Sequence, residues 1–238
     1  MAQEKKRLDD QTMALRLARE FQDGMVINLG GGIPTLACNY IPEGREVLFQ
    51  SETGILGFGP IAAPDQVDWD LLNASGQPVT VAPGMSVFNH DDGFCMIRGG
   101  HIDLVVLGGL QVSEKGDLAN WVRGSLESCG WDVVKWIREG GFPPSVGGAI
   151  DLATGAKKVI VAMTHTTKDG RPKIVKKCSY ELTAKERVDL IITDVAVIEV
   201  TKKGLVLKEI APGWTPADVQ AITEPKLIVD PKCKEIEL

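Results

Sequence analysis

The sequence lacks the residue spacings and the charge balance that are typical of metal, disulfide and nucleic-acid sites. It has three histidines, which show no metal-ligand spacing such as HxxxH, and five cysteines, none of them in a CxxC pair. The sequence therefore gives no support for a zinc site, and the odd number of cysteines favours reduced thiols. Twenty-six Lys and Arg against thirty-two Asp and Glu leave a net charge of −6. A duplex-binding surface needs clustered cations to neutralise phosphates, so no nucleic-acid partner is expected.

Long apolar runs are also missing. No segment approaches the roughly 20 apolar residues that span a bilayer, and the charged N-terminal segment lacks the apolar stretch of a secretory signal. We therefore expect a cytoplasmic protein with no membrane partner. Aliphatic residues and glycine are abundant instead, since 44% of the chain is hydrophobic although only 5% is aromatic, and 26 residues are glycine. The length suits one large α/β domain or two small ones, and the lack of an internal repeat or a long linker favours a single domain, residues 1–238.

Hydrophobic patterns along the chain predict alternating strands and helices. Ala14, Leu17, Ala18 and Phe21 recur at helical spacing. Short runs rich in Val and Ile show little alternation, which favours an open, mainly parallel sheet covered by helices on both faces. Strands are expected at 25–30, 46–50, 78–83, 101–110, 157–163, 188–193, 195–200 and 205–210. Further helices are expected within 30–41 after a glycine turn, and at 86–98, 148–156 and 215–222.

One acid, Glu52, stands among glycines in "FQSETGILGFGP", residues 49–60, directly after a predicted strand. Asn28 and a second group of glycines lie at the end of the preceding strand. A glycine weakens regular backbone by roughly 0.5–1 kcal/mol, so such groups favour places where backbone and ligand come close. Ligands collect beyond the carboxyl ends of parallel strands, so the two strand ends predict one site. The glycines concerned are Gly30, Gly31, Gly32, Gly54, Gly57 and Gly59.

Three interpretations of Glu52 are open from these residues alone. It is a solvated charge that orders a loop, the ribose-binding acid of a dinucleotide fold, or a nucleophile. The dinucleotide fingerprint GxGxxG is incomplete, because Thr35 occupies the place of its third glycine. A nucleophilic carboxylate would attack an activated acyl carbon, and glycine backbone and the Asn28 amide would supply donors to the oxyanion. Asp117 and Asn120 are expected to organise a turn near this site.

The motif around Glu52 belongs to a series that resembles the B (beta) subunit of the class I coenzyme A transferases, the 3-oxoacid CoA-transferase group. Residues 49–60 resemble the family's glutamate signature, and "MIRGGHIDLVVLGGLQVSEKGDLANW" resembles its long central block. The match continues in "INLGGGIPTLACNYIP", "VGGAIDLATGAKKVIVAMTHTTKDGRPKIVKKC", "DLIITDVAVIEV" and "LKEIAPGWTPADVQAIT". So many motifs in order, over nearly the whole chain, make the resemblance specific.

The resemblance implies a fold, a reaction and residue roles. The fold is the open α/β sheet of CoA-transferases and NagB/RpiA-like proteins. Glu52 is then the catalytic nucleophile, and Asn28 matches the family asparagine near the reacting carbonyl. Gly148 and Ala149, in "VGGAID", match positions whose backbone lines the oxyanion pocket. The reaction is a ping-pong transfer of CoA from an acyl-CoA of the succinyl-CoA or acetyl-CoA type to a carboxylic acid such as a 3-oxoacid, through a glutamyl-CoA thioester.

The same resemblance implies partners. CoA is a substrate, and no metal or tightly bound cofactor is required. The active site lies between this kind of chain and a sister A (alpha) subunit, commonly in an A2B2 heterotetramer, so we expect the isolated chain to be inactive. Ketone-body or short-chain acid metabolism is the expected setting, and the sequence leaves open which acids are exchanged.

Two departures from the family pattern bear on this prediction. Thr53 stands where the signature usually has asparagine, which keeps a hydrogen-bond donor but loses the amide, so acyl preference or rate is expected to differ. Residues 122–145 form a longer segment than the family pattern, and Trp131, Val134 and Trp136 suit a lid, a subunit interface or a surface excursion. These departures leave an alternative function open, a non-catalytic ligand-binding or scaffold subunit on the same fold.

Overall fold

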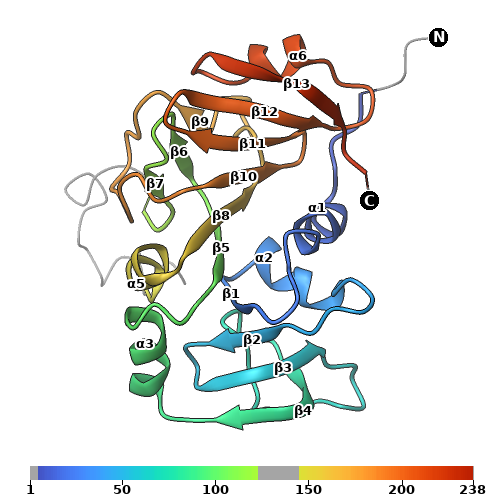
Figure 1. Ribbon diagram of the computed structural model, residues 1–238, viewed down its shortest axis with the longest axis vertical. Helices are drawn as coiled ribbons and strands as arrows, with labels where there is room; N and C mark the ends of the chain where they lie inside the picture. The colour runs from blue at the N-terminus through green and yellow to red at the C-terminus, as the bar shows by residue number, and fades with distance from the viewer. Residues whose placement is uncertain (1–4, 123–144, 238) are drawn as a thin grey trace, which may run out of the picture.

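The computed structural model describes residues 5–122 and 145–237 and builds them around a ten-stranded sheet (Figure 1). Its strands are β1 (Val26–Leu29), β2 (Leu48–Ser51), β3 (Ile55–Ile61), β4 (Val79–Val87), β5 (Leu104–Gly108), β8 (Lys158–Met163), β10 (Leu190–Thr193), β11 (Ala196–Thr201), β12 (Gly204–Ile210) and β13 (Leu227–Glu235). A smaller sheet has the order β7 (Leu118–Ala119), β6 (Gln111–Ser113) and β9 (Ile174–Val175). The helices are α1 (Asp10–Ala18), α2 (Ile33–Leu36), α3 (His90–Arg98), α5 (Ala149–Gly155) and α6 (Pro216–Ala221), with a 3-10 turn η1 (Ala37–Asn39).

The large sheet has a parallel centre and antiparallel margins. Its order is β13-β12-β11-β10-β8-β5-β1-β2-β3-β4. The run from β10 to β2 is parallel throughout, whereas β3 and β4 on one side and β11 and β12 on the other are antiparallel to their inner neighbours. Within the described residues β13 and β4 are the two edges. The prediction of an open, mainly parallel α/β sheet is therefore confirmed.

Both faces of the sheet are covered, as the Val- and Ile-rich strands predicted. Along β5, Leu104 and Val106 pack in one apolar cluster with α1, and Val105 and Leu107 pack in another with α3, α5 and α6. Successive strand residues point to opposite faces, so this alternation shows a helical layer on each side. Each fully buried aliphatic side chain contributes about 1.5–3 kcal/mol through the hydrophobic effect. The sheet thereby becomes a rigid base for the loops at its carboxyl edge.

The structure moves the start of one predicted helix and adds strands at both margins of the large sheet. The helix predicted at 86–98 begins only at His90, because Ser86 and Val87 continue β4 and pair with Leu56 and Ile55 of β3. Strand β3 was not predicted, since its glycines and Pro60 disfavour a strand. Strand β13 was also not predicted. The helices predicted at 148–156 and 215–222 are confirmed as α5 and α6.

Some predictions lie beyond what the structure tests. Trp131, Val134 and Trp136 fall in 123–144, outside the described residues. The assignment of 1–238 to one domain remains a prediction. Among the described residues, no helix is long and apolar enough to cross a membrane.

Candidate active site

Glu52 is the first residue after β2, at the carboxyl edge of the parallel sheet. The chain turns back immediately, because the Gly54 N–H donates to the Ser51 carbonyl at 3.1 Å and β3 then pairs antiparallel to β2. Gly54 has a φ of +107°, and a Cβ at this position would lie 2.4 Å from the Phe88 carbonyl oxygen. A side chain is excluded at Gly54 on both counts. The tight turn holds Glu52 at the tip of the hairpin, half-buried.

A buried amide contacts the Glu52 carboxylate. Asn28 lies on β1, fully buried, and its Nδ2 donates to Glu52 Oε2 at 3.1 Å and to Gln50 Oε1 at 2.7 Å. Parallel pairing places Asn28 opposite Gln50 on β2, so the two amides project from the same face of the sheet. Gln50 in turn donates to the Gly93 carbonyl of α3 at 3.3 Å. Asn28 Oδ1 is buried and has no hydrogen-bond partner among the described residues.

A cavity of about 360 Å³ opens beside this carboxylate. A Cβ added to Gly148 would lie 3.5 Å from Glu52 Oε1 and 3.2 Å from the Phe94 ring, so the bare glycine leaves the carboxylate accessible. The Ala149 N–H donates to the Val146 carbonyl at 3.1 Å. Of the site residues predicted from sequence, the cavity brings together Gly30, Gly31, Glu52, Gly148 and Ala149.

The remaining predicted residues lie around this cavity and do not line it. Thr53 is exposed, and its Oγ1 lies 2.9 Å from the Leu72 carbonyl oxygen. A carbonyl only accepts, so the hydroxyl proton of Thr53 points to that loop. Gly32 has a φ of +85°, and its N–H donates to Ser75 Oγ at 3.2 Å.

Gly57 and Gly59 do not line the cavity, and they allow close packing between strands of the sheet. Both lie in β3, where a Cβ on Gly57 would contact Leu48 and one on Gly59 would lie 2.4 Å from Thr80 Oγ1. Gly57 also has a φ of +77°. These two glycines allow β3 to pass closely between β2 and β4.

Three polar residues of the site were missed or only partly predicted. Gln50 gave no signal beyond an amide inside a predicted strand. His90 contacts the Glu52 backbone carbonyl through Nδ1, which therefore carries the proton. Asn120 was expected near the site, and the structure shows it lining the cavity while its Oδ1 accepts from Thr183 Oγ1 at 2.6 Å. Asp117 accepts from Ser113 Oγ at 2.8 Å and organises the preceding turn, and it does not line the cavity.

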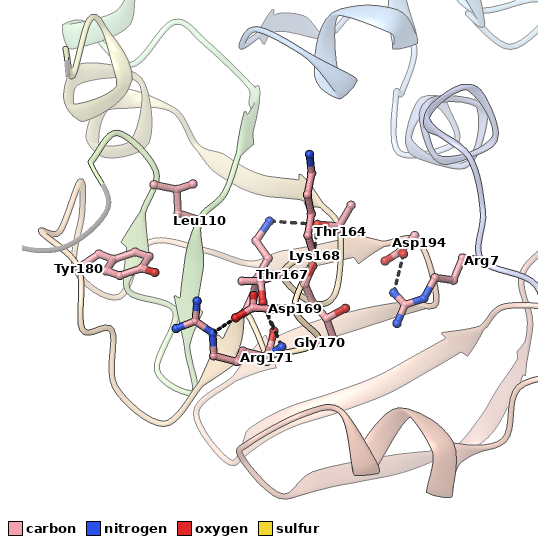
Figure 2. A pocket seen from close by; sticks show the side chains of 12 residues that line it. Arg7, Leu110, Thr164, Thr167, Lys168, Asp169, Gly170, Arg171, Tyr180 and Asp194 are labelled. Carbon is pink, nitrogen blue, oxygen red and sulfur yellow. Dashed lines mark hydrogen bonds and ion pairs between the residues drawn. The ribbon is translucent and has the colours of Figure 1, made fainter. Parts of the chain in front are cut away.

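A second, larger cavity of about 710 Å³ lies beyond the carboxyl ends of β8 and β10 (Figure 2). Charges of both signs line it, and they are paired in part: Arg7 contacts Asp194 at 2.7 Å, and Arg171 contacts Asp169 at 2.6 Å (Figure 2). None of the sequence-predicted site residues lines this cavity. The Glu52 cavity therefore remains the candidate active site.

The other reactive groups in the described part of the chain offer no competing site. No group of three or more His, Cys, Asp or Glu is placed to hold a metal ion among the described residues. Burial raises the pKa of the Cys38 thiol to about 11 and that of Cys178 to about 12. Thiols with such pKa values are protonated near neutral pH and are poor nucleophiles.

The fold and site together define a class, an open α/β protein that presents an amide-bonded carboxylate at the carboxyl edge of its sheet. Comparison with known families narrows this class. Residues 10–221 match the sequence profile of the family described as Coenzyme A transferase, and the chain belongs to that family.

Individual relatives agree with the family match. The chain is 44% identical over 219 residues to the beta subunit of acetate CoA-transferase from Escherichia coli (strain K12), and the match covers 92% of this chain and 93% of that one. It is 49% identical over 205 residues to the B subunit of 3-oxoadipate CoA-transferase from Pseudomonas putida, covering 86% and 89%. The solved thioester complex with CoA of the acyl-CoA transferase YdiF from Escherichia coli O157:H7 has a TM-score of 0.70 at 20% identity, covering 98% of this chain and 44% of that one. At that identity the last match supports the fold alone.

Proposed function

We propose that this chain is the catalytic beta subunit of a CoA-transferase, with Glu52 as its nucleophile. The observation that carries the proposal is the Glu52 carboxylate, which accepts from the buried Asn28 amide and borders a cavity that Gly148 leaves open. A carboxylate nucleophile carries no proton that a partner base must remove. Membership of the coenzyme A transferase family supplies the reaction class.

The proposed reaction is a double displacement. A Glu52 carboxylate oxygen attacks the thioester carbonyl of the donor acyl-CoA, the C–S bond breaks, and an acyl-glutamyl anhydride and CoA thiolate form. The thiolate then attacks the glutamyl carbonyl, which releases the donor acid as its carboxylate and leaves a glutamyl-CoA thioester. An acceptor carboxylate repeats the two steps in reverse. Each step exchanges one acyl–oxygen or acyl–sulfur bond for another, so no redox cofactor or net proton transfer is needed.

The described residues offer donors for the oxyanions of these steps. The Asn28 N–H already faces the Glu52 carboxylate, and the backbone at Gly148 borders the same carboxylate. Preorganised donors of this kind are typically worth about 10²–10³ in rate each. The Ala149 N–H donates to the Val146 carbonyl. It could therefore donate to an oxyanion only after breaking that hydrogen bond.

The proposed substrates and partners follow the relatives. We propose an acyl-CoA of the succinyl-CoA or acetyl-CoA type as donor and a small carboxylic acid, such as a 3-oxoacid, as acceptor. The two relatives carry the names of beta and B subunits, which supports a sister A (alpha) subunit, and we propose an A2B2 assembly. A cytoplasmic location remains a prediction.

An exchange assay tests the proposal. The co-expressed pair of subunits should transfer CoA from succinyl-CoA or acetyl-CoA to acetate, acetoacetate or 3-oxoadipate, and this panel identifies the acids. Glu52→Gln keeps an acceptor for Asn28 and removes the nucleophile, so exchange should fall by at least about 10³-fold. Full exchange by the Glu52→Gln pair would refute the nucleophile, and a folded wild-type pair inactive on the whole panel would favour a scaffold role.

A further inference from the structure

We propose that Gln50 is a positioning residue for this transfer, which holds the Asn28 amide so that an N–H faces Glu52 throughout the reaction cycle. The inference rests on the proposed role of Glu52 as nucleophile. Gln50 is 1% exposed, lies one strand away from Asn28 and two residues before Glu52, and does not itself line the cavity. It therefore acts through Asn28 and not on the substrate.

The donor and acceptor of each hydrogen bond between α3 and Glu52 can be assigned, starting from the backbone carbonyl of α3. The Gly93 carbonyl of α3 accepts only, so the Gln50 side chain must present Nε2 to it, at 3.3 Å. Gln50 Oε1 then faces Asn28, which must present Nδ2, at 2.7 Å. The second N–H of that same Nδ2 donates to Glu52 Oε2 at 3.1 Å. The Gly93 carbonyl thus determines the orientation of the Gln50 amide, and Gln50 in turn orients the Asn28 amide with an N–H towards the Glu52 carboxylate.

A flipped Asn28 amide would place its oxygen against two acceptors, Gln50 Oε1 and Glu52 Oε2. No contact on the other side of the amide opposes such a flip, because Asn28 Oδ1 has no hydrogen-bond partner among the described residues. The orientation of Asn28 therefore depends on Gln50 and Glu52 together.

The two contacts differ once the reaction begins. When Glu52 becomes an anhydride or a thioester it loses its negative charge, and its hydrogen bond to Asn28 weakens, because charge-assisted bonds are roughly twice as strong as neutral ones. The contact with Gln50 does not change during the cycle. Gln50 is thus the contact that keeps the Asn28 N–H aimed at the glutamyl carbonyl when the thiolate and then the acceptor acid attack it.

Gly93 lies where α3 packs against the Gln50 amide. A Cβ at position 93 would lie 3.5 Å from Gln50 Nε2 and 3.6 Å from the Cα of Glu52. These are ordinary contact distances, so α3 packs directly against β2 at this point, and the tightest contact of such a Cβ would be with the Phe88 ring at 3.2 Å.

A purely structural role for Gln50, tying β2 to α3, predicts a different result from a positioning role. The test uses the complex with the A (alpha) subunit and measures single-turnover formation of the glutamyl thioester from succinyl-CoA by rapid quench and intact mass. Gln50→Met keeps the length of the side chain and removes both amide contacts. It should slow thioester formation by about 10–100-fold with the KM for succinyl-CoA unchanged within about twofold.

The dependence on Asn28 is tested in a double-mutant cycle. In an Asn28→Ala background, Gln50→Met should slow thioester formation by less than about threefold, because the residue through which it acts is gone. Gln220→Met is the matched control: this amide ties α6 to the Thr223 and Pro225 carbonyls at the far end of the sheet, so its loss should leave the rate unchanged. Equal slowing by Gln50→Met in both backgrounds, or no slowing in either, would overturn the inference.

A second variant, Gln50→Glu, tests the same role if the Gln50→Met chain does not fold. In Gln50→Glu the carboxyl keeps an acceptor for Asn28, and its protonated form alone also donates to the Gly93 carbonyl. Its rate relative to wild type should rise as the pH falls from about 8 to about 5, and a flat ratio would contradict a positioning role. A wild-type complex that forms no thioester on Glu52 with succinyl-CoA or acetyl-CoA refutes the proposed function itself, which separates that failure from this one.

Discussion

At the scale of single residues, a glycine and a buried amide determine which oxygens of the Glu52 carboxylate are accessible. Gly148 leaves one carboxylate oxygen open to the cavity, and Asn28 holds the other. Thr53, the residue that departs from the family pattern, is turned away from both, with its hydroxyl on the Leu72 carbonyl. Thr53 therefore ties the hairpin turn to the loop at Leu72. Because its side chain does not face the cavity, its effect on acyl preference should be small.

The Thr53 contact makes a prediction at this scale. Thr53→Asn should change kcat/KM by less than about threefold for any acyl-CoA in the panel, because the side chain does not line the cavity. Thr53→Val should instead lower the free energy of unfolding by about 0.5–1.5 kcal/mol through the lost hydrogen bond. Steady-state assays and urea denaturation check the two effects. A tenfold or larger change in acyl preference for Thr53→Asn would contradict this assignment.

At the scale of elements, the β2–β3 hairpin positions Glu52, the proposed nucleophile. Gly54 is the residue on which the turn depends, since it combines a left-handed φ with close approach to the Phe88 carbonyl. The Phe88 N–H also donates to the Gly54 carbonyl at 2.9 Å, which ties the hairpin to the chain that leads into α3. Gly54 therefore fixes both the hairpin turn that carries Glu52 and its attachment to the chain before α3.

The expected result for Gly54→Ala is a loss of at least about 2 kcal/mol in the free energy of unfolding, because strain and a clash add. Gly76→Ala is the matched control: its φ of +69° is also left-handed, but a Cβ there meets nothing within 4 Å. Its loss should be nearer to about 1 kcal/mol. Chemical denaturation of both variants measures the difference, and equal losses would show that the clash with Phe88 does not matter.

Sequence patterns predicted the strand ends that carry Glu52 and Asn28, but they did not predict strand β3 or the contacts of Gln50. Strand–loop junctions predicted Glu52 and Asn28 at the carboxyl edge, because strand ends and glycines are local signals. Strand β3 was missed because its stability comes from pairing with β2 and β4, and not from the propensity of residues 55–61. Gln50 was missed because its hydrogen-bond partners, Asn28 and Gly93, are distant in sequence.

At the scale of the whole molecule, stability should depend on pH through one buried histidine. His165 is fully buried between the hydroxyls of Thr193 and Thr223. Burial lowers its pKa from 6.5 to about 4, with the charges of Arg7 and Lys173 adding to the shift and Asp194 opposing it. Folding therefore favours the neutral imidazole. This contribution is fully present above about pH 6.5 and is lost as the pH falls towards 4.

Between pH 7 and pH 5 the free energy of unfolding should fall by about 2 kcal/mol from this group. Denaturation curves across this range, for wild type and His165→Gln, measure the effect, and the variant should show a much flatter profile. His101→Gln, at an exposed histidine, should keep the wild-type slope. An unchanged slope in His165→Gln would show that His165 is not the group responsible.

The edge strand β4 also carries two strongly exposed hydrophobic side chains, since Val81 and Val87 are 68% and 71% exposed. With the proposed A (alpha) subunit as partner, the chain alone should show no exchange, and activity should rise on titration with that partner and saturate at equimolar amounts. Calibrated size-exclusion chromatography with light scattering should give the A2B2 mass. Robust turnover by the isolated chain would contradict the need for a partner.

The central claim, a covalent bond between Glu52 and CoA during turnover, is tested most directly by mapping the intermediate. The complex is incubated with succinyl-CoA or acetyl-CoA without acceptor, treated with borohydride, digested and analysed by mass spectrometry. We predict reduction of the Glu52 side chain to its alcohol in the peptide that spans residues 46–98, dependent on acyl-CoA and absent in Glu52→Gln. An unmodified Glu52 in a complex that is actively exchanging CoA would contradict the account.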